Sequence, residues 1–424
     1  MVTAMNSKRD EIGMCVAVVG AGIIGLSSAV SLQRRGAQVT VFDSLPPGGG
    51  ASYGNAGLLS VDTCTPISLP GALLQVPRWL MDPLGPLAIN PRYALRATPW
   101  LLKWLRAGRM DRVVAASDAL RALHMPALDH YRELLGPRHF DDLIRVTGQI
   151  HLYDGERESA GERITHQLYE RHGIIATPLD DRQLHELIPD LAPSVRRGVL
   201  LPKNGYTVNP HRLVQCLAEL HRVAGGKLRH ESVMKILLEP GPSYRLLTTQ
   251  GDRRFHKLLV AAGAFSMRLL APLGVHMPLE TERGYHVTIP NPAVDLRIPL
   301  LHKTRGFAAT PMEIGLRLAG TVEIAGLEAA MNERRAEVLL RQGKMLFPSL
   351  QANDFSAWMG FRPSLPDSVP VIDESAHHSG LFIACGHGHF GMIAGATTGR
   401  LVSQLMLGER PFVDPSPYSL ARFG

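Results

Sequence analysis

The sequence predicts an α/β protein of two domains, one of which is built from segments far apart in the chain. Three observations lead to this prediction. Between residues 15 and 43, a strand, a glycine turn, a helix and a second strand follow one another. Small-residue turns follow apolar strands again near residues 261 and 386. The sequence between these turns alternates helical patterns interrupted by prolines with β-rich stretches. It has no phosphate-binding pattern, which is what we expect of an inserted domain.

The opening unit carries a pattern that is typical of dinucleotide binding. The apolar run 15–19 reads as a buried parallel strand, and Gly20, Gly22 and Gly25 follow it at once. The first glycine permits a tight turn, the second lets a pyrophosphate approach the backbone, and the third lets the helix pack close to the strand. The helix expected over 23–35 would direct its amide dipole at the phosphates.

The second strand, expected over 39–42, ends in a carboxylate. Asp43 follows it at the spacing from Gly25 at which an acid accepts ribose hydroxyls. A carboxylate there disfavours a 2′-phosphate, so the ligand would be NAD or FAD rather than NADP. The alternative is an ordinary βαβ unit with incidental glycines, and the order of all these elements argues against it.

Composition places the chain among ordinary globular proteins. It has 424 residues, 45% hydrophobic and 20% charged, which is enough for two domains with full cores. The four cysteines lie far apart without a CxxC pair, so reduced thiols in a cytoplasmic protein are the simplest interpretation. No apolar run reaches the roughly 18–20 residues of a spanning helix. A cleaved signal is excluded because its apolar part would be the glycine-turn unit itself.

The formal net charge of +7 is compatible with nucleic acid or an anionic membrane surface as a partner. Because Arg and Lys are spread along the whole chain, we expect no nucleic acid. Only the span 92–112 is locally basic, and Trp100 and Trp104 lie in it at helical spacing. It is interpreted either as a packed amphipathic helix or as a helix in peripheral contact with a membrane.

The remaining segments extend the same architecture. In the loop 45–59, Ser52 and Asn55 lie among glycines, which favours a binding loop over a flexible linker. Asn209 is expected to cap a helix over 211–223. Further helices are expected over 118–135 and 332–345, and a final helix opens at 386–391 and runs to about 407. Strands are expected over 145–153, 233–238, 244–249, 257–262, 279–289, 315–324 and 381–384.

These motifs resemble the D-amino acid oxidase/glycine oxidase superfamily of FAD-dependent enzymes, and most of all its D-amino acid dehydrogenases. The resemblance covers essentially the whole chain and rests on 20–25 with Asp43, 52–57, 261–266, 284–286, 360–363 with Pro366 and Asp367, and 386–388. It implies a D-amino acid oxidase-like fold with a Rossmann-like, discontinuous FAD-binding domain and an α+β substrate (cap) domain. The expected FAD-binding segments are 12–65, 195–272 and 352–420, and the expected cap segments are 66–194 and 273–351.

The resemblance also implies roles for individual residues. Arg362 would pair with the substrate carboxylate, for which a planar, permanently charged fork is suited. The alternative partners of Arg362 are Asp367 and Asp373. Tyr285 and His286 would line the pocket as catalytic residues, and the alternative is a buried strand pair with satisfied polar tips.

The cofactor would be held by backbone turns and small side chains. His387 and His389 lie on a turn beside Cys385, but ligands at that spacing rarely point at one ion, so no metal is expected. This turn and the next helix would face the flavin ring, where the helix dipole stabilises the reduced, anionic form. The expected FAD contacts are Gly20, Gly22, Ile23, Ile24, Gly25, Asp43, Ser52, Asn55, Ala56, Gly57, Val233, Gly263, Gly386, His387, Gly388 and His389.

The implied reaction is oxidative deamination of a D-amino acid, with hydride transfer from the α-carbon to flavin N5 and formation of an imine and a 2-oxo acid. The segments 386–391 and 398–400 are also similar to D-hydroxyproline dehydrogenases, so cis-4-hydroxy-D-proline stays open as a substrate. A glycine- or sarcosine-type oxidase that releases hydrogen peroxide, a flavin-binding subunit of a hetero-oligomeric dehydrogenase and an NAD-dependent dehydrogenase are the alternatives.

The expected partners are a small D-amino acid and an electron acceptor, either a membrane quinone or an electron-transfer chain. The expected location is the cytoplasm, with peripheral contact at the inner face of the cell membrane.

Overall fold

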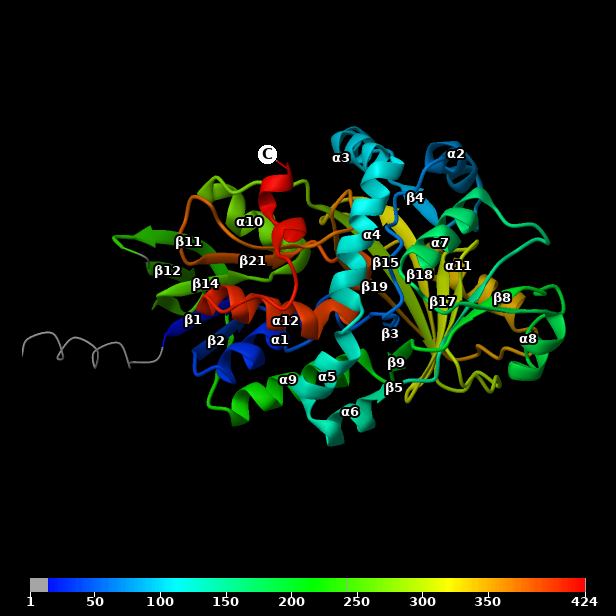
Figure 1. Ribbon diagram of the computed structural model, residues 1–424, viewed down its shortest axis with the longest axis horizontal. Coiled ribbons are helices and arrows are strands. Elements are labelled where there is room, and N and C mark those ends of the chain that lie inside the picture. The colour runs from blue at the N-terminus through cyan, green and yellow to red at the C-terminus, as the bar shows by residue number, and fades with distance from the viewer. Residues whose placement is uncertain (1–13, 242, 424) are drawn as a thin grey trace, which may run out of the picture.

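The computed structural model describes residues 14–241 and 243–423, which form two bodies built around two large sheets (Figure 1). One body contains the six-stranded sheet with α1, α9 and α12, and the other contains the nine-stranded sheet with α8 and α11. None of the helices in this described part has both the length and the hydrophobicity that a bilayer-spanning helix needs.

The six-stranded sheet gathers strands from three distant parts of the chain. Its central strands are buried and rich in β-branched and aliphatic residues, as a sheet covered on both faces requires. The order is β10 (Lys227–His230), β2 (Gln38–Asp43), β1 (Cys15–Val19), β14 (Lys257–Val260), β21 (Leu381–Cys385) and β20 (Val371–Glu374), all parallel except β20. The prediction of a discontinuous Rossmann-like domain is therefore confirmed.

The helices on this sheet are held close by small residues and by a cap. Helices α1 (Ile23–Gln33) and α12 (Gly391–Leu407) cross where a Cβ on Gly399 would lie 2.6 Å from the carbonyl carbon of Ser27. Helix α9 (Pro210–Val223) starts at Asn209, whose side chain accepts the N–H groups of residues 211 and 212, as predicted for this cap.

The nine-stranded sheet buries one face against α11 (Glu333–Leu346), and its aliphatic side chains form a second core there. Strand β4 (Leu87–Ile89) pairs with β18 beside the main path. The main path is β19 (Ser356–Ser364), β15 (Glu280–Ile289), β18 (Gly315–Ile324), β17 (Phe307–Met312), β16 (Leu300–His302), β6 (Gln149–Leu152), β8 (Gly198–Leu201) and β7 (Thr177–Leu179).

Smaller elements complete the described part of the chain. Two three-stranded sheets are β11 (Val233–Glu239) with β12 (Ser243–Thr248) and β13 (Gly251–Phe255), and β3 (Leu58–Leu59) with β9 (Gly205–Thr207) and β5 (Ile144–Arg145). The other α-helices are α2 (Ala72–Met81), α3 (Ala94–Ala107), α4 (Met110–His124), α5 (Ala127–Leu135), α6 (Pro137–Leu143), α7 (Ala160–Arg171), α8 (Asp181–Leu187) and α10 (Ser266–Leu270). Short 3₁₀ turns are η1 (Gly263–Phe265), η2 (Ala271–Leu273), η3 (Gly388–Phe390), η4 (Ser416–Tyr418) and η5 (Leu420–Phe423).

Two predicted elements are divided in the structure. The helix expected over 118–135 is two helices, α4 and α5, which separate at Pro126, a residue that has no N–H to donate within a continuous helix. The strand expected over 145–153 is β5 and β6, which separate at a turn where Gly148 adopts a φ of +83°.

Several segments do not belong to the domain that was expected for them from the sequence. Helices α4 and α5, expected in the cap, bury Leu120, Leu123 and Tyr131 in the core that covers the six-stranded sheet. Strands β8 and β19, expected in the FAD-binding domain, pair along β6 and β15 in the nine-stranded sheet. Backbone pairing and apolar burial decide these placements, and neither can be read from the local pattern of one segment.

Candidate active site

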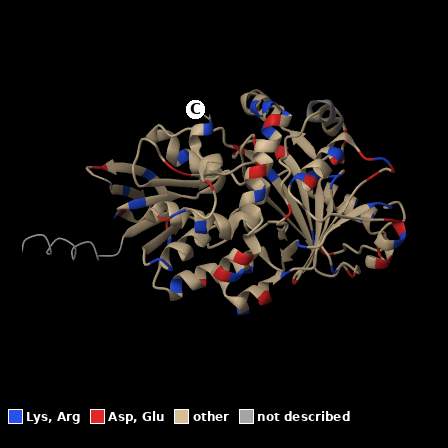
Figure 2. Cartoon of the chain, viewed as in Figure 1, with Lys and Arg blue, Asp and Glu red and all other residues tan. Residues whose placement is uncertain are grey.

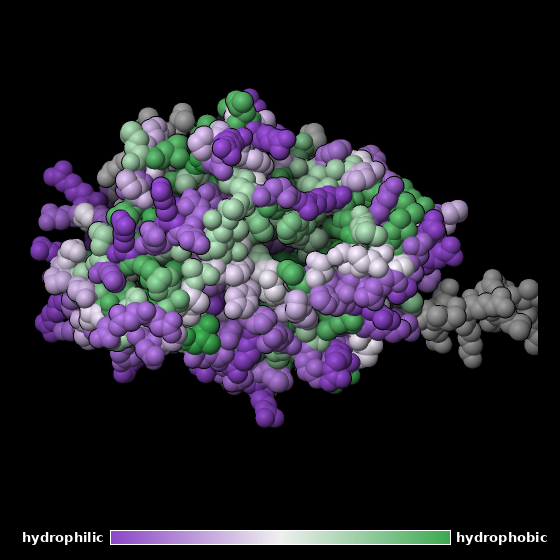
Figure 3. Space-filling view, turned by 180° about the vertical axis from the view of Figure 1, so that it is seen from behind, coloured by the Kyte–Doolittle hydropathy of each residue, from purple (hydrophilic) through white to green (hydrophobic). Residues whose placement is uncertain are grey.

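A continuous cavity of about 1960 Å³ separates the two large sheets, with lining residues from β1 and α1 on one side and from β15, β18 and β19 on the other. A hollow also opens near the middle of the rear face of the molecule (Figure 3). Small-molecule pockets usually measure roughly 300–1,000 Å³. The cavity is therefore large enough for an extended ligand together with a second, smaller one.

The glycine turn lies at one end of this cavity, and its conformation requires the glycines. Gly20 has a φ of +115°, and a Cβ there would lie 2.3 Å from the carbonyl oxygen of Ala261. A Cβ on Gly25 would lie 1.8 Å from the carbonyl oxygen of Gly20. Gly22 lines the cavity as the N-cap of α1, so the positive end of the helix dipole is available to a phosphate.

Two polar side chains brace this turn from the cavity side. Asp43 accepts the N–H of Ala21 at 2.7 Å with one carboxylate oxygen and the N–H of Leu45 at 2.9 Å with the other. Ser52 Oγ accepts the N–H of Ile23 at 3.0 Å. Asp43 and Ser52 both line the cavity, so residues predicted to contact the cofactor also fix the backbone that would hold it.

Most predicted cofactor contacts meet at this cavity. The residues that line it are Gly20, Gly22, Ile23, Ile24, Asp43, Ser52, Asn55, Ala56, Val233, Gly263, His387, Gly388 and His389. Gly25, Gly57 and Gly386 lie behind the lining, where each is packed against another part of the fold. A Cβ on Gly386, for example, would lie 2.2 Å from a side-chain carbon of Leu365. These three glycines shape the cavity wall.

The turn before α12 directs its two histidines to different partners. His387 Nε2 lies 3.0 Å from Thr398 Oγ1, and burial lowers the pKa of His387 to about 3, so its ring is neutral. His389 instead reaches Glu282. Among the residues that the structure describes, no group of three or more His, Cys, Asp or Glu side chains is placed to hold a metal ion. Helix α12 begins at the cavity without an acidic residue in its first turn.

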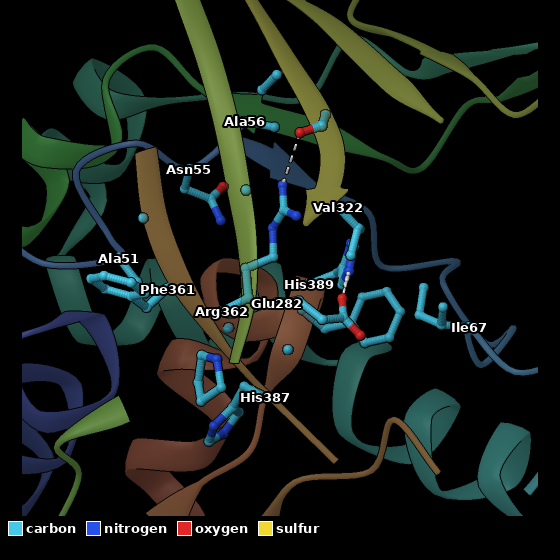
Figure 4. Close-up of a pocket in the computed structure, with 18 of the residues that line it drawn as sticks. Ala51, Asn55, Ala56, Ile67, Glu282, Val322, Phe361, Arg362, His387 and His389 are labelled. Carbon is cyan, nitrogen blue, oxygen red and sulfur yellow. Dashed lines mark hydrogen bonds and ion pairs between the residues drawn. The ribbon is translucent and has the colours of Figure 1, made fainter. Parts of the chain in front are cut away.

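Arg362 lies on β19 and lines the cavity (Figure 4). Its guanidinium covers Gly284, where a Cβ would lie 2.2 Å from Cζ, and it donates to the carbonyl oxygens of Thr321 at 3.0 Å and Gly320 at 3.5 Å. In residues 14–241 and 243–423 no carboxylate lies within ion-pair distance of Arg362. Its remaining donors are therefore available to an anionic ligand.

The two alternative partners of Arg362 are engaged elsewhere. Asp367 forms an ion pair of 2.9 Å with Arg422. Asp373 accepts the hydroxyl of Ser419 at 2.7 Å and the N–H of Leu420 at 2.8 Å. Neither aspartate competes with a ligand for Arg362.

Glu282 is a charged residue of the site that the sequence interpretation missed. It lies on β15 with only 6% of its surface exposed, and its Oε2 is 2.7 Å from His389 Nε2 (Figure 4). Burial alone would raise the pKa of Glu282, but the hydrogen bond and charge of His389, with the charge of Arg362, hold it below its usual value. The available signal was a glutamate within a segment that was expected to be a strand, because buried carboxylates need partners.

Tyr285 and His286 do not reach the cavity. Tyr285 is in the core between the nine-stranded sheet and α11, where its hydroxyl donates to Glu323 and accepts the N–H of Asn332. His286 hydrogen-bonds to the carbonyl oxygen of Gly54 and stacks on the ring of Trp358. The predicted pocket-lining position of both residues is corrected to a buried pair with satisfied polar tips, because β15 alternates its faces and turns Tyr285 into the core.

Comparison with known proteins gives this site a family. The family model described as DAO, FAD dependent oxidoreductase, matches residues 15–405, which include the glycine turn, Arg362 and α12. The chain belongs to the DAO family. A D-amino-acid oxidase of Bradyrhizobium diazoefficiens is 38% identical over 418 residues, covering 97% of this chain and 99% of that relative. The chain is thus an FAD-dependent oxidoreductase.

Solved structures share the DAO fold along almost the whole chain. Glycine oxidase from Geobacillus kaustophilus is 24% identical, with a TM-score of 0.71 over 96% of this chain and 98% of its own. L-Proline dehydrogenase from P. horikoshii is 17% identical, with a TM-score of 0.72 over 97% of this chain and 98% of its own. At these identities the likeness concerns the fold, and the predicted D-amino acid oxidase-like architecture is confirmed.

The DAO cofactor fits the observed cavity. Its diphosphate would face Gly20, Gly22 and the first turn of α1, where no side chain blocks the backbone. Asp43 would face the ribose, and the turn at 387–389 with the start of α12 would face the flavin ring.

Proposed function

We propose that this DAO-family enzyme oxidatively deaminates D-amino acids. One observation carries the proposal: Arg362 faces the cavity between the nucleotide turn and the nine-stranded sheet without a carboxylate partner. A planar guanidinium with free donors selects a carboxylate by paired, charge-assisted hydrogen bonds. The identity of 38% with a D-amino-acid oxidase supports the D-amino acid as the source of that carboxylate.

The chain contributes binding, orientation and exclusion of water. Arg362 holds the substrate carboxylate, and its own position is fixed by the carbonyl oxygens of residues 320 and 321. The Glu282–His389 pair forms part of the cavity wall next to Arg362. The carboxylate of Glu282 keeps a negative charge near the Arg362 guanidinium. Bound FAD supplies the acceptor for the two electrons that leave the amine. Loss of the α-hydrogen and one N–H proton gives an imine, which takes up water and releases ammonia to form a 2-oxo acid.

Anaerobic mixing of the FAD-loaded protein with single amino acids tests this proposal. We expect D-amino acids to bleach the yellow absorbance of the flavin while their L-forms leave it unchanged. The panel includes glycine, sarcosine and cis-4-hydroxy-D-proline, which stand for the glycine-type oxidase and the cyclic-amine alternatives. Bleaching by none of the D-amino acids, with FAD bound, would overturn the proposal.

We further propose that the enzyme is a dehydrogenase that passes its electrons to an acceptor at a membrane. Support comes from α2 and α3, which place Trp79, Trp100 and Trp104 on the cavity side. Their outer surface exposes Leu95 by 88% and Met81 by 77%. Helix α3 carries basic residues and no acidic one (Figure 2). Exposed apolar side chains beside basic ones favour an anionic bilayer surface.

Two measurements test the acceptor and the surface. During aerobic turnover the rate of hydrogen peroxide release should be much lower than the rate at which a soluble quinone is reduced. One peroxide released for each amino acid oxidised would favour the oxidase alternative. The protein should sediment with vesicles that contain anionic lipid at low salt and less so at high salt. A protein that stays in the supernatant with such vesicles at low salt would contradict the membrane contact.

A further inference from the structure

The cavity extends well beyond Arg362 and contains a second cationic side chain. Lys303 follows β16 and lines the cavity. It is an exposed residue, yet burial lowers the pKa of its ammonium group. The accessible surface of Lys303 borders the cavity, and the packed atoms around its ammonium group still remove part of the water from it. A cation in such a position is costly unless an anion approaches it.

The protein itself provides no such anion. Across the described residues the Lys303 ammonium has neither an ion pair nor a hydrogen bond, and the Cys64 thiol is the group that acts on it electrostatically. The carboxylates nearby pair with other cations: Asp154 pairs with His302 and Arg305, and Asp62 pairs with Arg121 through Oδ1. Burial also raises the pKa of the Cys64 thiol, so that group stays neutral.

Two further polar groups beside Lys303 lack partners. His151 and Tyr153, on and just after β6, line the cavity and are 5% and 4% exposed. The His151 Nε2 atom and the Tyr153 hydroxyl have no hydrogen-bond partner among the described residues. Buried polar atoms without partners are rare in proteins, and a ligand is one explanation for them. Burial lowers the pKa of His151, so Lys303 is the cation of this group.

The pairing of β16, β17 and β18 places Lys303 near the residues that hold Arg362. Phe307 pairs with Gly320 on one side and with His302 on the other, so the next residues outward, Thr321 and Lys303, lie in one row across β17. Two strand spacings separate them, which is roughly 10 Å. The carbonyl oxygen of Thr321 holds Arg362. Arg362 and Lys303 therefore border the same cavity, and the backbone positions that hold them, Thr321 and Lys303, are two strand spacings apart.

We propose that Lys303, with His151 and Tyr153 beside it, binds the second carboxylate of an acidic D-amino acid whose α-carboxylate is held by Arg362. This inference rests on the proposed function and adds the substrate class to it. D-Aspartate and D-glutamate have the required chemistry. D-Asparagine and D-glutamine have nearly the same shape but lack the second charge, so the site would discriminate against them by charge.

Steady-state kinetics with these four amino acids test the inference. We expect kcat/KM for D-glutamate to exceed that for D-glutamine by about tenfold or more, as for a charge-assisted pair in an enclosed site. Lys303→Met should lower kcat/KM for the acidic substrates by a similar factor and leave the neutral D-amino acids within about twofold. Lys303→Arg, which keeps the positive charge, should retain most of the preference.

Matched controls separate this site from general damage. Lys344→Met removes an exposed lysine on α11, outside the cavity lining, and should leave the preference unchanged. Unfolding temperature and the absorbance of bound FAD should be the same in all variants. An equal loss for acidic and neutral substrates in Lys303→Met, or wild-type enzyme without a preference for the acidic members, would overturn the inference.

A binding measurement separates failure of this inference from failure of the proposed function. Calorimetric titration with glutarate and with butyrate needs no turnover, and we expect tighter binding of glutarate that is lost in Lys303→Met. Equal binding of the two acids would overturn the Lys303 site even if neutral D-amino acids bleach the flavin. Tighter, Lys303-dependent binding of glutarate would support the site even if no D-amino acid is oxidised.

Discussion

His389 donates a hydrogen bond of 2.7 Å from Nε2 to the Oε2 atom of Glu282, and this bond joins the turn before α12 to strand β15 (Figure 4). It therefore connects the cofactor side of the cavity with the sheet that carries the proposed substrate clamp. Burial lowers the pKa of the Arg362 guanidinium, and the charge of Glu282 opposes part of that shift. One buried carboxylate thus accepts a hydrogen bond from His389 and acts on the charge of Arg362.

Glu282→Gln should destabilise the protein by about 1–3 kcal/mol at neutral pH, because a buried, charge-assisted hydrogen bond becomes a neutral one. The pKa of Glu282 is held below its ordinary value of 4.5 in the folded protein. Its stabilising effect is therefore present above pH 4.5 and is lost as the pH falls through the folded value. Urea unfolding at pH 7 and pH 4 should show a variant deficit that shrinks at the lower pH.

Glu280→Gln is the matched control on the same strand. Burial raises the pKa of Glu280 despite hydrogen bonds from Thr281 and Tyr93, so the fold disfavours its charged form on balance. We expect a smaller loss of stability than in Glu282→Gln. Equal losses in both variants at pH 7 would contradict the special position of Glu282.

Arg362→Lys should lower kcat/KM for D-amino acids by about a hundredfold, since an ammonium cannot form the planar pair of hydrogen bonds to a carboxylate. FAD absorbance and unfolding temperature should stay near those of the wild type. The control is Arg341→Lys, an exposed position on α11. Activity within about threefold of wild type in Arg362→Lys would show that the carboxylate is bound elsewhere.

The sequence predicted the nucleotide half of the site far better than the substrate half. Strand, glycine turn and helix between residues 15 and 43 are one local unit, so spacing alone identified Gly20, Gly22 and Asp43. The substrate half is assembled by strand pairing between β15, β18 and β19, which are far apart in sequence. Local patterns cannot show which face of β15 meets the cavity, and Tyr285 was consequently preferred over Glu282.

The domain division was limited for a similar reason. The chain crosses between the two bodies several times, and helical periodicity predicts that α4 and α5 have an apolar face without showing which core receives it. Lys303 offered no signal at all in the sequence. Its interest comes from the cavity around it and from carboxylates that are engaged elsewhere.

His124→Asn should make the protein less sensitive to mild acid. Burial lowers the pKa of His124 from 6.5 to about 4, so between these values the unfolded chain binds a proton that the folded one does not. Stability contributed by the neutral ring is present above pH 6.5 and is lost as the pH falls toward 4, at about 1.4 kcal/mol per pH unit. Asparagine can still donate to the Thr63 carbonyl, which His124 Nδ1 contacts at 2.8 Å.

The difference should be visible as a shallower decrease of unfolding temperature between pH 6.5 and pH 4.5 in His124→Asn than in wild type. His139→Asn, at an exposed position of α6, is the control and should follow the wild-type curve. Parallel curves for wild type and His124→Asn would show that this ring does not drive the acid sensitivity.

Tyr285→Phe should reduce stability and leave catalysis almost unchanged. The hydroxyl of Tyr285 satisfies both the Glu323 carboxylate and the N–H of Asn332 in a buried position, and burial with the Glu323 contact raises its pKa to about 12. Its removal leaves two buried polar groups short of a partner, which costs about 1–3 kcal/mol. Tyr53→Phe, on a side chain that is 40% exposed, is the stability control. Urea unfolding combined with anaerobic flavin reduction separates the two roles: unchanged stability with a large fall in the reduction rate would return Tyr285 to the active site, whereas lower stability with a reduction rate within about twofold of wild type agrees with its place in the core behind β15.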